Sequence, residues 1–123
     1  ELKKNPTSRR AVVLVRNESD IGSSDPACLQ HMQFSIHNGK LDLSILFRSN
    51  DACKATFMNA YALIEIQKRI ADSLEIEVGT YTHRANSFHA YESDWAMLDG
   101  AAKRIENGRL LFFPSDTYFK MNL

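Results

Sequence analysis

The sequence is poor in cysteine, and this scarcity limits the covalent and metal chemistry open to it. Only Cys28 and Cys53 occur among 123 residues, and their number and spacing suit neither a zinc cluster nor a disulfide framework. The four histidines are scattered, without the HxH or HxxxH spacing that places two imidazoles on one metal. We therefore expect no metal site.

An excess of one charge and long apolar runs are also missing. Lysine plus arginine and aspartate plus glutamate each number 15, so the formal net charge is zero. This balance argues against a broad surface for polyanions and leaves only a local basic pocket open. No apolar run is long enough to cross a bilayer, and no signal peptide opens the sequence. We expect a cytoplasmic protein that binds neither nucleic acid nor membrane.

The length suits a single domain, 1–123, with one sizeable core. Its first eight residues, 1–8, are polar and are expected to form an exposed arm. Internal repeats, glycine-rich phosphate loops and low-complexity segments are missing from the sequence. The chain begins at Glu1 without a methionine, which leaves open that it is a piece of a longer protein.

The segment 25–51 predicts an antiparallel hairpin with chemistry at both ends. Asn38-Gly39 accepts positive φ and favours a tight turn. Apolar and polar residues alternate on both sides of that turn, which is typical of strands with one face on a core. Folding on the turn brings Cys28 close to Arg48. A thiol beside a guanidinium is a candidate nucleophile next to an anion site.

Two further segments predict strands, and a third does not resemble core. The apolar, β-branched run 11–15 predicts a buried strand. The segment 75–82 predicts another strand, in which Gly79 indicates a bulge or a close backbone approach. The segment 83–91 is polar and aromatic, so we expect it to lie outside the core.

The helical signals are one long segment and one short one. Thr56–Leu74 repeats apolar residues at helical spacing and predicts a core helix, with Thr56 as its N-cap. A second helix is predicted over 94–106, ended by Asn107-Gly108, and a short strand is expected within 109–123. These elements predict an α+β fold with a mostly antiparallel or mixed sheet, one long core helix and one shorter helix.

Arg9 and Arg10 stand immediately before the apolar run. They admit two interpretations. Arginines at a strand entrance are commonly solvated, whereas two guanidinium forks can also clamp a phosphate. The residues themselves leave both open.

An ordered set of short motifs resembles the thymidylate synthase family, which includes the pyrimidine-nucleotide hydroxymethylases. The motifs in chain order are Asn5-Pro6-Thr7-Ser8-Arg9-Arg10, Pro26-Ala27-Cys28, Gln33-Phe34, Arg48-Ser49-Asn50-Asp51, Tyr61-Ala62-Leu63 and His89-Ala90-Tyr91. Each motif alone is weak, but their order and approximate spacing together match the central and C-terminal part of that family.

The resemblance implies transfer of a one-carbon unit, methyl or hydroxymethyl, to carbon 5 of a pyrimidine nucleoside monophosphate. The implied cofactor is methylenetetrahydrofolate. Cys28 matches the cysteine that attacks carbon 6 of the base, and Asp51 matches an aspartate that contacts the base and the folate side. Arg48 and Ser49 match phosphate contacts. Covalent attack of this kind requires a thiolate.

The resemblance also implies a homodimer, because Arg9 and Arg10 match a pair that reaches the phosphate of the neighbouring subunit. His89 and Tyr91 match the pair that binds the ribose hydroxyl. Asn59 stands near the place of the asparagine that distinguishes uracil from cytosine, in a segment that departs from the family pattern.

The folate half of the site matches less well. The family's N-terminal region, which supplies a catalytic glutamate and tryptophans, is not part of this sequence. Leu29 replaces the histidine that follows the cysteine, Arg16 replaces a tryptophan, and 85–87 replaces Gly-Gly-Asp. These departures keep an alternative open: a degenerate nucleotide-binding, structural or oligomerisation domain without catalysis.

Overall fold

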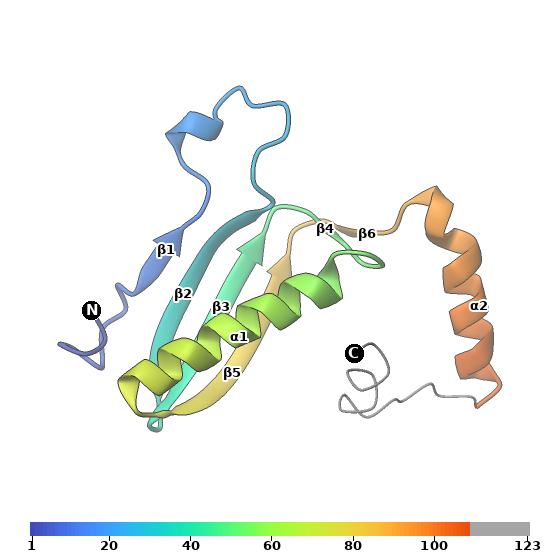
Figure 1. Cartoon of the computed structure of the whole chain (residues 1–123). Helices are drawn as coiled ribbons and strands as arrows, with labels where there is room; N and C mark the ends of the chain where they lie inside the picture. Colours follow the sequence, from blue (N-terminus) through green and yellow to red (C-terminus); the bar gives the residue numbers. More distant parts are fainter. Residues whose placement is uncertain (109–123) are drawn as a thin grey trace, which may run out of the picture. The chain divides into compact units, whose positions relative to one another are not determined.

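The computed structural model describes residues 1–108 (Figure 1). It contains two compact units, Glu1–Ala90 and a second that begins at Tyr91, and each is described by itself. The short strand predicted within 109–123 lies outside the described residues. Among residues 1–108, every helix is too short or too polar to cross a membrane.

The first unit is built on a four-stranded mixed sheet with the strand order β1-β2-β3-β5. The strands are β1 (Val12–Leu14), β2 (Leu29–His37), β3 (Lys40–Phe47) and β5 (Glu77–Ala85). The first three pair antiparallel, and β5 runs parallel to β3. Two short parallel strands, β4 (Asn50–Asp51) and β6 (Phe88–His89), form a second sheet. The predicted α+β class with a mixed sheet is confirmed.

The β2–β3 hairpin turns where the sequence predicts. Asn38 and Gly39 have φ values of 50° and 74°, which is the pair of positive angles that a type I′ turn requires. His37 and Lys40 face each other across the turn. The turn therefore fixes the register of both strands as far as His31, where the pairing shifts before Leu29. The hairpin carries its far ends, near Cys28 and Arg48, to the same end of the sheet.

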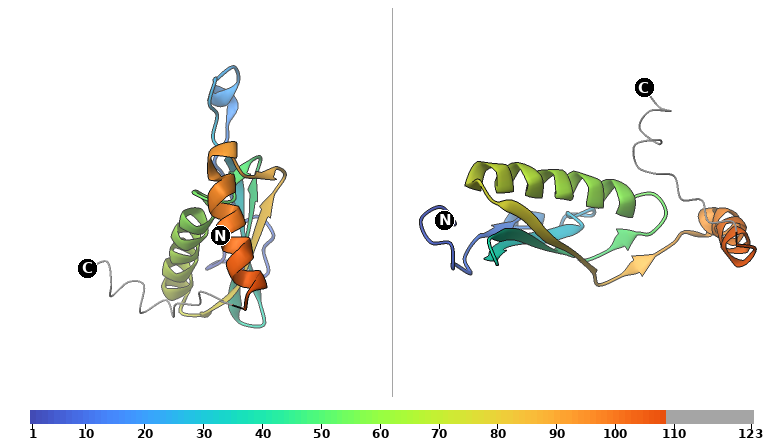
Figure 2. Two further views of the ribbon diagram at one scale, coloured as in Figure 1. Left: turned by 90° about the vertical axis from the view of Figure 1, so that its right-hand side faces the viewer. Right: turned by 90° about the horizontal axis from the view of Figure 1, so that it is seen from below.

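Helix α1 (Thr56–Leu74) covers one face of this sheet (Figures 1 and 2). Its Leu63 and Ala71 are buried against the sheet's core-facing side chains, which are Phe34, Leu41, Leu43, Ile45 and Phe47. The bounds of α1 agree with the prediction, but its predicted cap is wrong. Ala55 is the N-cap, and the Thr56 hydroxyl instead donates a hydrogen bond to the Asp51 carbonyl at 2.7 Å.

The predicted irregularity at Gly79 is confirmed as a close backbone approach. The register between β3 and β5 shifts between Leu41 and Leu43. A Cβ on Gly79 would meet the Asp42 carboxylate and would lie 3.0 Å from the Leu41 carbonyl oxygen. Buried Gln67 joins the strands here, since its Nε2 donates to the carbonyls of Leu41 and Thr80.

Three sequence expectations about burial are corrected by the structure. The run 11–15 is not a buried strand, because β1 lies at the sheet edge and exposes Val12–Leu14. The polar arm is not wholly exposed, since Leu2 joins the core cluster and Ser8 is also buried. The segment 83–91 is not entirely outside the core, because Ala85 packs against the core cluster and His83 stacks on Phe47.

The second unit contains a 3-10 turn, Glu92–Asp94, followed by helix α2 (Trp95–Glu106). The predicted second helix is confirmed, starting one residue later than expected. Its end also agrees with the sequence: Asn107 is the C-cap, and Gly108 takes a φ of 69°.

Candidate functional site

Cys28 and Arg48 are neighbours at the ends of β2 and β3. The Arg48 backbone N–H donates to the Cys28 carbonyl at 2.8 Å, directly beyond the paired residues Leu29 and Phe47. The hairpin therefore brings the two predicted residues together. Cys28 is exposed and forms no disulfide, so its thiol is accessible to a small molecule.

The Arg48 guanidinium is held in place by the segment that precedes Cys28. Its Nη2 donates to the Pro26 carbonyl at 2.7 Å, and its Nε lies 3.3 Å from the Ala27 carbonyl that accepts from it. Asp25 lies 3.7 Å from Nη2 but is almost fully exposed, and such surface ion pairs contribute about 0–1 kcal/mol. Nη1 has no hydrogen bond within residues 1–108. It is a fixed cationic donor available to an anion.

The chain after Arg48 is fastened to the segment around His89. The Asn50 N–H donates to the Ser87 carbonyl and the Ala52 N–H to the His89 carbonyl, both at 2.8 Å. These bonds bring Ser49 to His89, whose Nδ1 lies 3.4 Å from the Ser49 hydroxyl oxygen. The structure thus gathers Cys28, Arg48, Ser49 and His89 where β2 begins, β3 ends and β4 pairs with β6.

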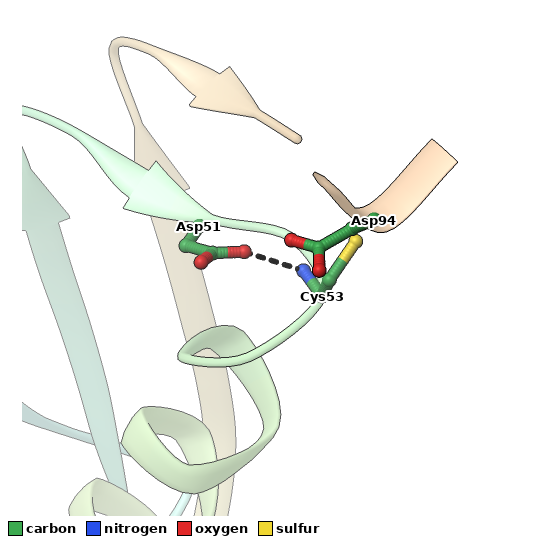
Figure 3. Close-up of side chains that lie close together, drawn as sticks. All are labelled: Asp51, Cys53 and Asp94. Atoms are coloured by element: carbon green, nitrogen blue, oxygen red, sulfur yellow. Dashed lines mark hydrogen bonds between the residues drawn. The ribbon is translucent and has the colours of Figure 1, made fainter. Parts of the chain in front are cut away.

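Asp51, which the resemblance places near the base, also stabilises the turn that follows it. Its Oδ1 accepts from the backbone N–H of Cys53 at 2.8 Å (Figure 3). The same oxygen accepts from the Lys54 N–H at 3.1 Å. The hydrogen bond from Lys54, together with that from Cys53, lowers the pKa of Asp51 below its usual value. The carboxylate is therefore ionised at neutral pH and is fixed in the turn that leads into α1.

The structure also contains a chain of hydrogen-bonded side chains, next to these residues, that the sequence analysis does not predict. Asn59 Nδ2 donates to Asn50 Oδ1 at 3.1 Å, and Asn50 Nδ2 lies 2.8 Å from His83 Nε2. His83 Nδ1 in turn lies 2.9 Å from the Tyr81 hydroxyl oxygen. Asn50 is only 3% exposed. The available sequence signal was the i, i+2 spacing of Tyr81 and His83, which places both on one strand face.

The two aromatic members of this chain are neutral at neutral pH. Burial lowers the pKa of His83 and raises the pKa of Tyr81 to about 12. The His83 ring also stacks on Phe47 of the core, with ring centroids 5.0 Å apart and an angle of 7° between the planes. The imidazole is therefore held by packing as well as by hydrogen bonds.

Arg9 and Arg10 are not brought to this cluster within one chain. The carbonyl of Ala11, directly after them, accepts from the Phe34 N–H at 2.8 Å. Phe34 is six positions beyond Cys28, a separation of roughly 20 Å along an extended strand. Both arginines are exposed, so they are available to a second molecule.

His89 and Tyr91 do not lie on one strand. Strand β6 ends at His89, and Tyr91 already belongs to the second unit as the residue before the 3-10 turn. The role of Tyr91 in binding ribose stays a prediction.

Comparison with known proteins places this arrangement in one family. The family model for thymidylate synthase matches residues 1–111. A Methanocaldococcus jannaschii protein, provisionally named thymidylate synthase, is 43% identical over 98 residues, which cover 74% of this chain and 44% of that protein. The deoxyuridylate hydroxymethyltransferase of Bacillus phage SP01 is 34% identical over 100 residues, covering 77% of this chain and 26% of the phage enzyme.

The fold agrees with this sequence similarity. The structure of thermostable thymidylate synthase A from Bacillus subtilis superposes with a TM-score of 0.72 at 28% sequence identity, covering 80% of this chain and 36% of that enzyme. The chain spans less than half the length of each of these relatives. With the family match extending over most of its length, the chain belongs to the thymidylate synthase family.

Proposed function

We propose that this chain forms the nucleotide half of a one-carbon transfer site, which binds a pyrimidine nucleoside monophosphate. The observation that carries the proposal is that Arg48, whose guanidinium is fixed by the segment before Cys28, lies next to the exposed Cys28. A nucleotide spans that arrangement, because its phosphate is the anion that Arg48 suits and its base is the electrophile that a thiolate attacks.

The phosphate is held from two sides in this proposal. Arg48 Nη1 and the Ser49 hydroxyl approach it from the chain that carries Cys28. Arg9 and Arg10 come from a second copy, because they lie far from the Cys28 of their own chain and are exposed. The functional form is therefore a homodimer, in which each nucleotide is bound by residues of both subunits.

The ribose and the base are bound at the other end of the cluster. His89 lies beside Ser49 and contacts the ribose hydroxyl, together with Tyr91. Asn59, whose amide is half-buried, reads the edge of the base. Asp51 contributes a fixed negative charge near the base, since its carboxylate is ionised and held by backbone N–H groups.

The reaction starts with attack of the Cys28 thiolate on carbon 6. A bond forms between sulfur and carbon 6, and the electron pair of the 5,6 double bond moves through carbon 4 onto its oxygen. The resulting enolate makes carbon 5 nucleophilic toward an electrophilic one-carbon donor. After carbon 5 has gained the new group and lost its proton, the thiolate leaves carbon 6 and the double bond is restored.

The described residues do not by themselves fit a folate. Asp51 is the residue that the resemblance assigns to the folate side, and its Oδ1 is already engaged by two backbone N–H groups. Leu29 stands where the family has a histidine. The proposal therefore assigns to residues 1–108 only the binding and activation of the nucleotide.

Tritium release from carbon 5 tests the proposal. Full-length protein supplied with methylenetetrahydrofolate is expected to release tritium from 5-tritiated dUMP or dCMP. Cys28→Ser is expected to bind the nucleotide but to release none, because the serine hydroxyl is a far weaker nucleophile than a thiolate. Release that survives Cys28→Ser contradicts the mechanism.

A second candidate function is nucleotide binding without catalysis, and the observation behind it is the departure from the family pattern at Leu29. Calorimetric titration with dUMP, dCMP and CMP separates the two candidates. Binding without tritium release supports a nucleotide-binding module. Failure of all three nucleotides to bind rejects both candidates and leaves a structural or oligomerisation role.

A further inference from the structure

Asn50 is the central member of the buried chain that runs from Asn59 to Tyr81. It stands between Ser49 and Asp51, but its own side chain is withdrawn from solvent. Both ends of its amide are occupied, with Oδ1 against Asn59 and Nδ2 against His83. A buried amide with both ends paired has a defined orientation, since rotating it by 180° would oppose donor to donor.

The direction of these hydrogen bonds follows from the placement of the Asn50 amide together with the neutral state of His83. A neutral imidazole has one donor and one acceptor nitrogen. Because Nε2 accepts from Asn50, the proton is on Nδ1, which donates to the Tyr81 hydroxyl oxygen. Stacking on Phe47 keeps the ring in this plane. His83 therefore holds Asn50 with its Oδ1 toward Asn59.

This direction is passed on to Asn59. The Asn50 Oδ1 requires a donor, so Asn59 presents its Nδ2 to it. Asn59 Oδ1 and the second Nδ2 hydrogen make no hydrogen bond within residues 1–108. Asn59 therefore keeps one acceptor and one donor for a ligand, and their orientation is determined by its hydrogen bond to Asn50.

We propose that Asn50 and His83 are positioning residues that fix how the Asn59 amide faces a pyrimidine base, and that they thereby set the preference between uracil and cytosine. The inference rests on the proposed function. Uracil offers a donor at N3 and an acceptor at O4, whereas cytosine offers an acceptor at N3 and a donor at N4. An amide that pairs with one base must turn over to pair with the other, and the buried chain opposes that rotation.

Variants of Asn50 separate positioning from simple support of the fold. Asn50→Leu has a similar volume but neither accepts from Asn59 nor donates to His83. Asn50→Asp keeps an acceptor for Asn59, and His83 can protonate Nε2 to donate to the new carboxylate. The leucine variant therefore removes the constraint on Asn59, and the aspartate variant preserves it.

The measurement is calorimetric titration of the full-length protein with dUMP and with dCMP. In Asn50→Leu we expect the ratio of the two dissociation constants to move toward one by about tenfold, the equivalent of one hydrogen bond. In Asn50→Asp the ratio should stay within about threefold of wild type. A structural defect alone would weaken both nucleotides together and leave the ratio unchanged.

His83 provides a second pair of variants in case Asn50→Leu does not fold. His83→Phe keeps an aromatic ring for stacking on Phe47 but offers Asn50 no acceptor. His83→Gln places a carbonyl oxygen where Nε2 accepts. We expect relaxed base preference in His83→Phe and retained preference in His83→Gln. Nitrogen-15 NMR of the wild type should also show Nδ1 protonated, and a proton on Nε2 instead would reverse the chain and overturn the assignment.

The possible failures are distinguishable. If the wild type binds one nucleotide preferentially, and both Asn50→Leu and His83→Phe keep that ratio, the positioning role is wrong while nucleotide binding stands. If the wild type binds neither nucleotide, the proposed function is wrong and the base-reading role of Asn59 falls with it.

Discussion

The effect of Arg48→Ala on nucleotide affinity can be estimated from the contacts of Arg48. Arg48→Ala removes the donor that faces the proposed phosphate position. A hydrogen bond to a charged group contributes about 1.5–3 kcal/mol, so the dissociation constant for dUMP should rise by roughly ten- to 150-fold. The variant also loses the bonds to the carbonyls of Pro26 and Ala27. These anchor the segment before Cys28 and contribute about 1–3 kcal/mol of unfolding free energy in total.

The two losses can be separated by the choice of ligand. Deoxyuridine lacks the phosphate but has the same base and sugar, so its affinity should respond only to the displaced segment. Arg48→Lys keeps the positive charge, but its single ammonium cannot engage both the carbonyls and a phosphate with the geometry of a guanidinium fork. We expect Arg48→Lys to lie between wild type and Arg48→Ala for dUMP.

Calorimetry with both ligands, together with urea unfolding, provides the assay. If Arg48 binds the phosphate, Arg48→Ala should weaken the binding of dUMP at least tenfold more than the binding of deoxyuridine. Equal weakening of the two ligands would show that Arg48 only supports the segment before Cys28. Unchanged affinity for dUMP would exclude Arg48 as the phosphate ligand.

Two predictions concern stability. Gly79→Ala should lower the unfolding free energy by about 1–3 kcal/mol, because its Cβ would collide with the Asp42 carboxylate and the Leu41 carbonyl. Gly100→Ala should raise the unfolding free energy by about 0.5–1 kcal/mol, because Gly100 lies in α2 and a Cβ there meets nothing within 4 Å. Equal urea midpoints for the two variants would contradict both expectations. The lowered pKa of His83 means that the unfolded chain binds its proton more readily, so stability should fall as pH drops below the ordinary value of 6.5. His83→Gln has no titrating group at this position, so it should lose less stability than the wild type between pH 7 and pH 5. Parallel plots of unfolding free energy against pH for the two proteins would show that His83 contributes nothing.

The features that the sequence predicts well are those determined by neighbouring residues. The Asn38-Gly39 turn follows from the tolerance of two adjacent residues for positive φ, and both angles are positive. The bounds of α1 follow from apolar periodicity. Once the turn fixes the register, counting along the two strands places Cys28 within one residue of Arg48, and a register shift between Leu29 and His31 makes the two direct neighbours.

The features that the sequence does not predict depend on which strands become neighbours. β1 is as apolar as a buried strand, yet it is exposed because it lies at the sheet edge. The link from Asn50 to His83 requires β3 to pair in parallel with β5, and β4 with β6, pairings that follow a long helical connection. The polarity of 83–91 suggested a surface segment, but His83 stacks on the core residue Phe47.

A structure of the full-length protein with a bound pyrimidine nucleotide tests the central claim most directly. We expect the phosphate on Nη1 of Arg48 and on the Ser49 hydroxyl, with the Cys28 sulfur facing carbon 6 of the base. The arginines that complete the phosphate site should be Arg9 and Arg10 of a second copy. A nucleotide bound away from Arg48, or with the base turned so that another atom faces Cys28, would contradict it.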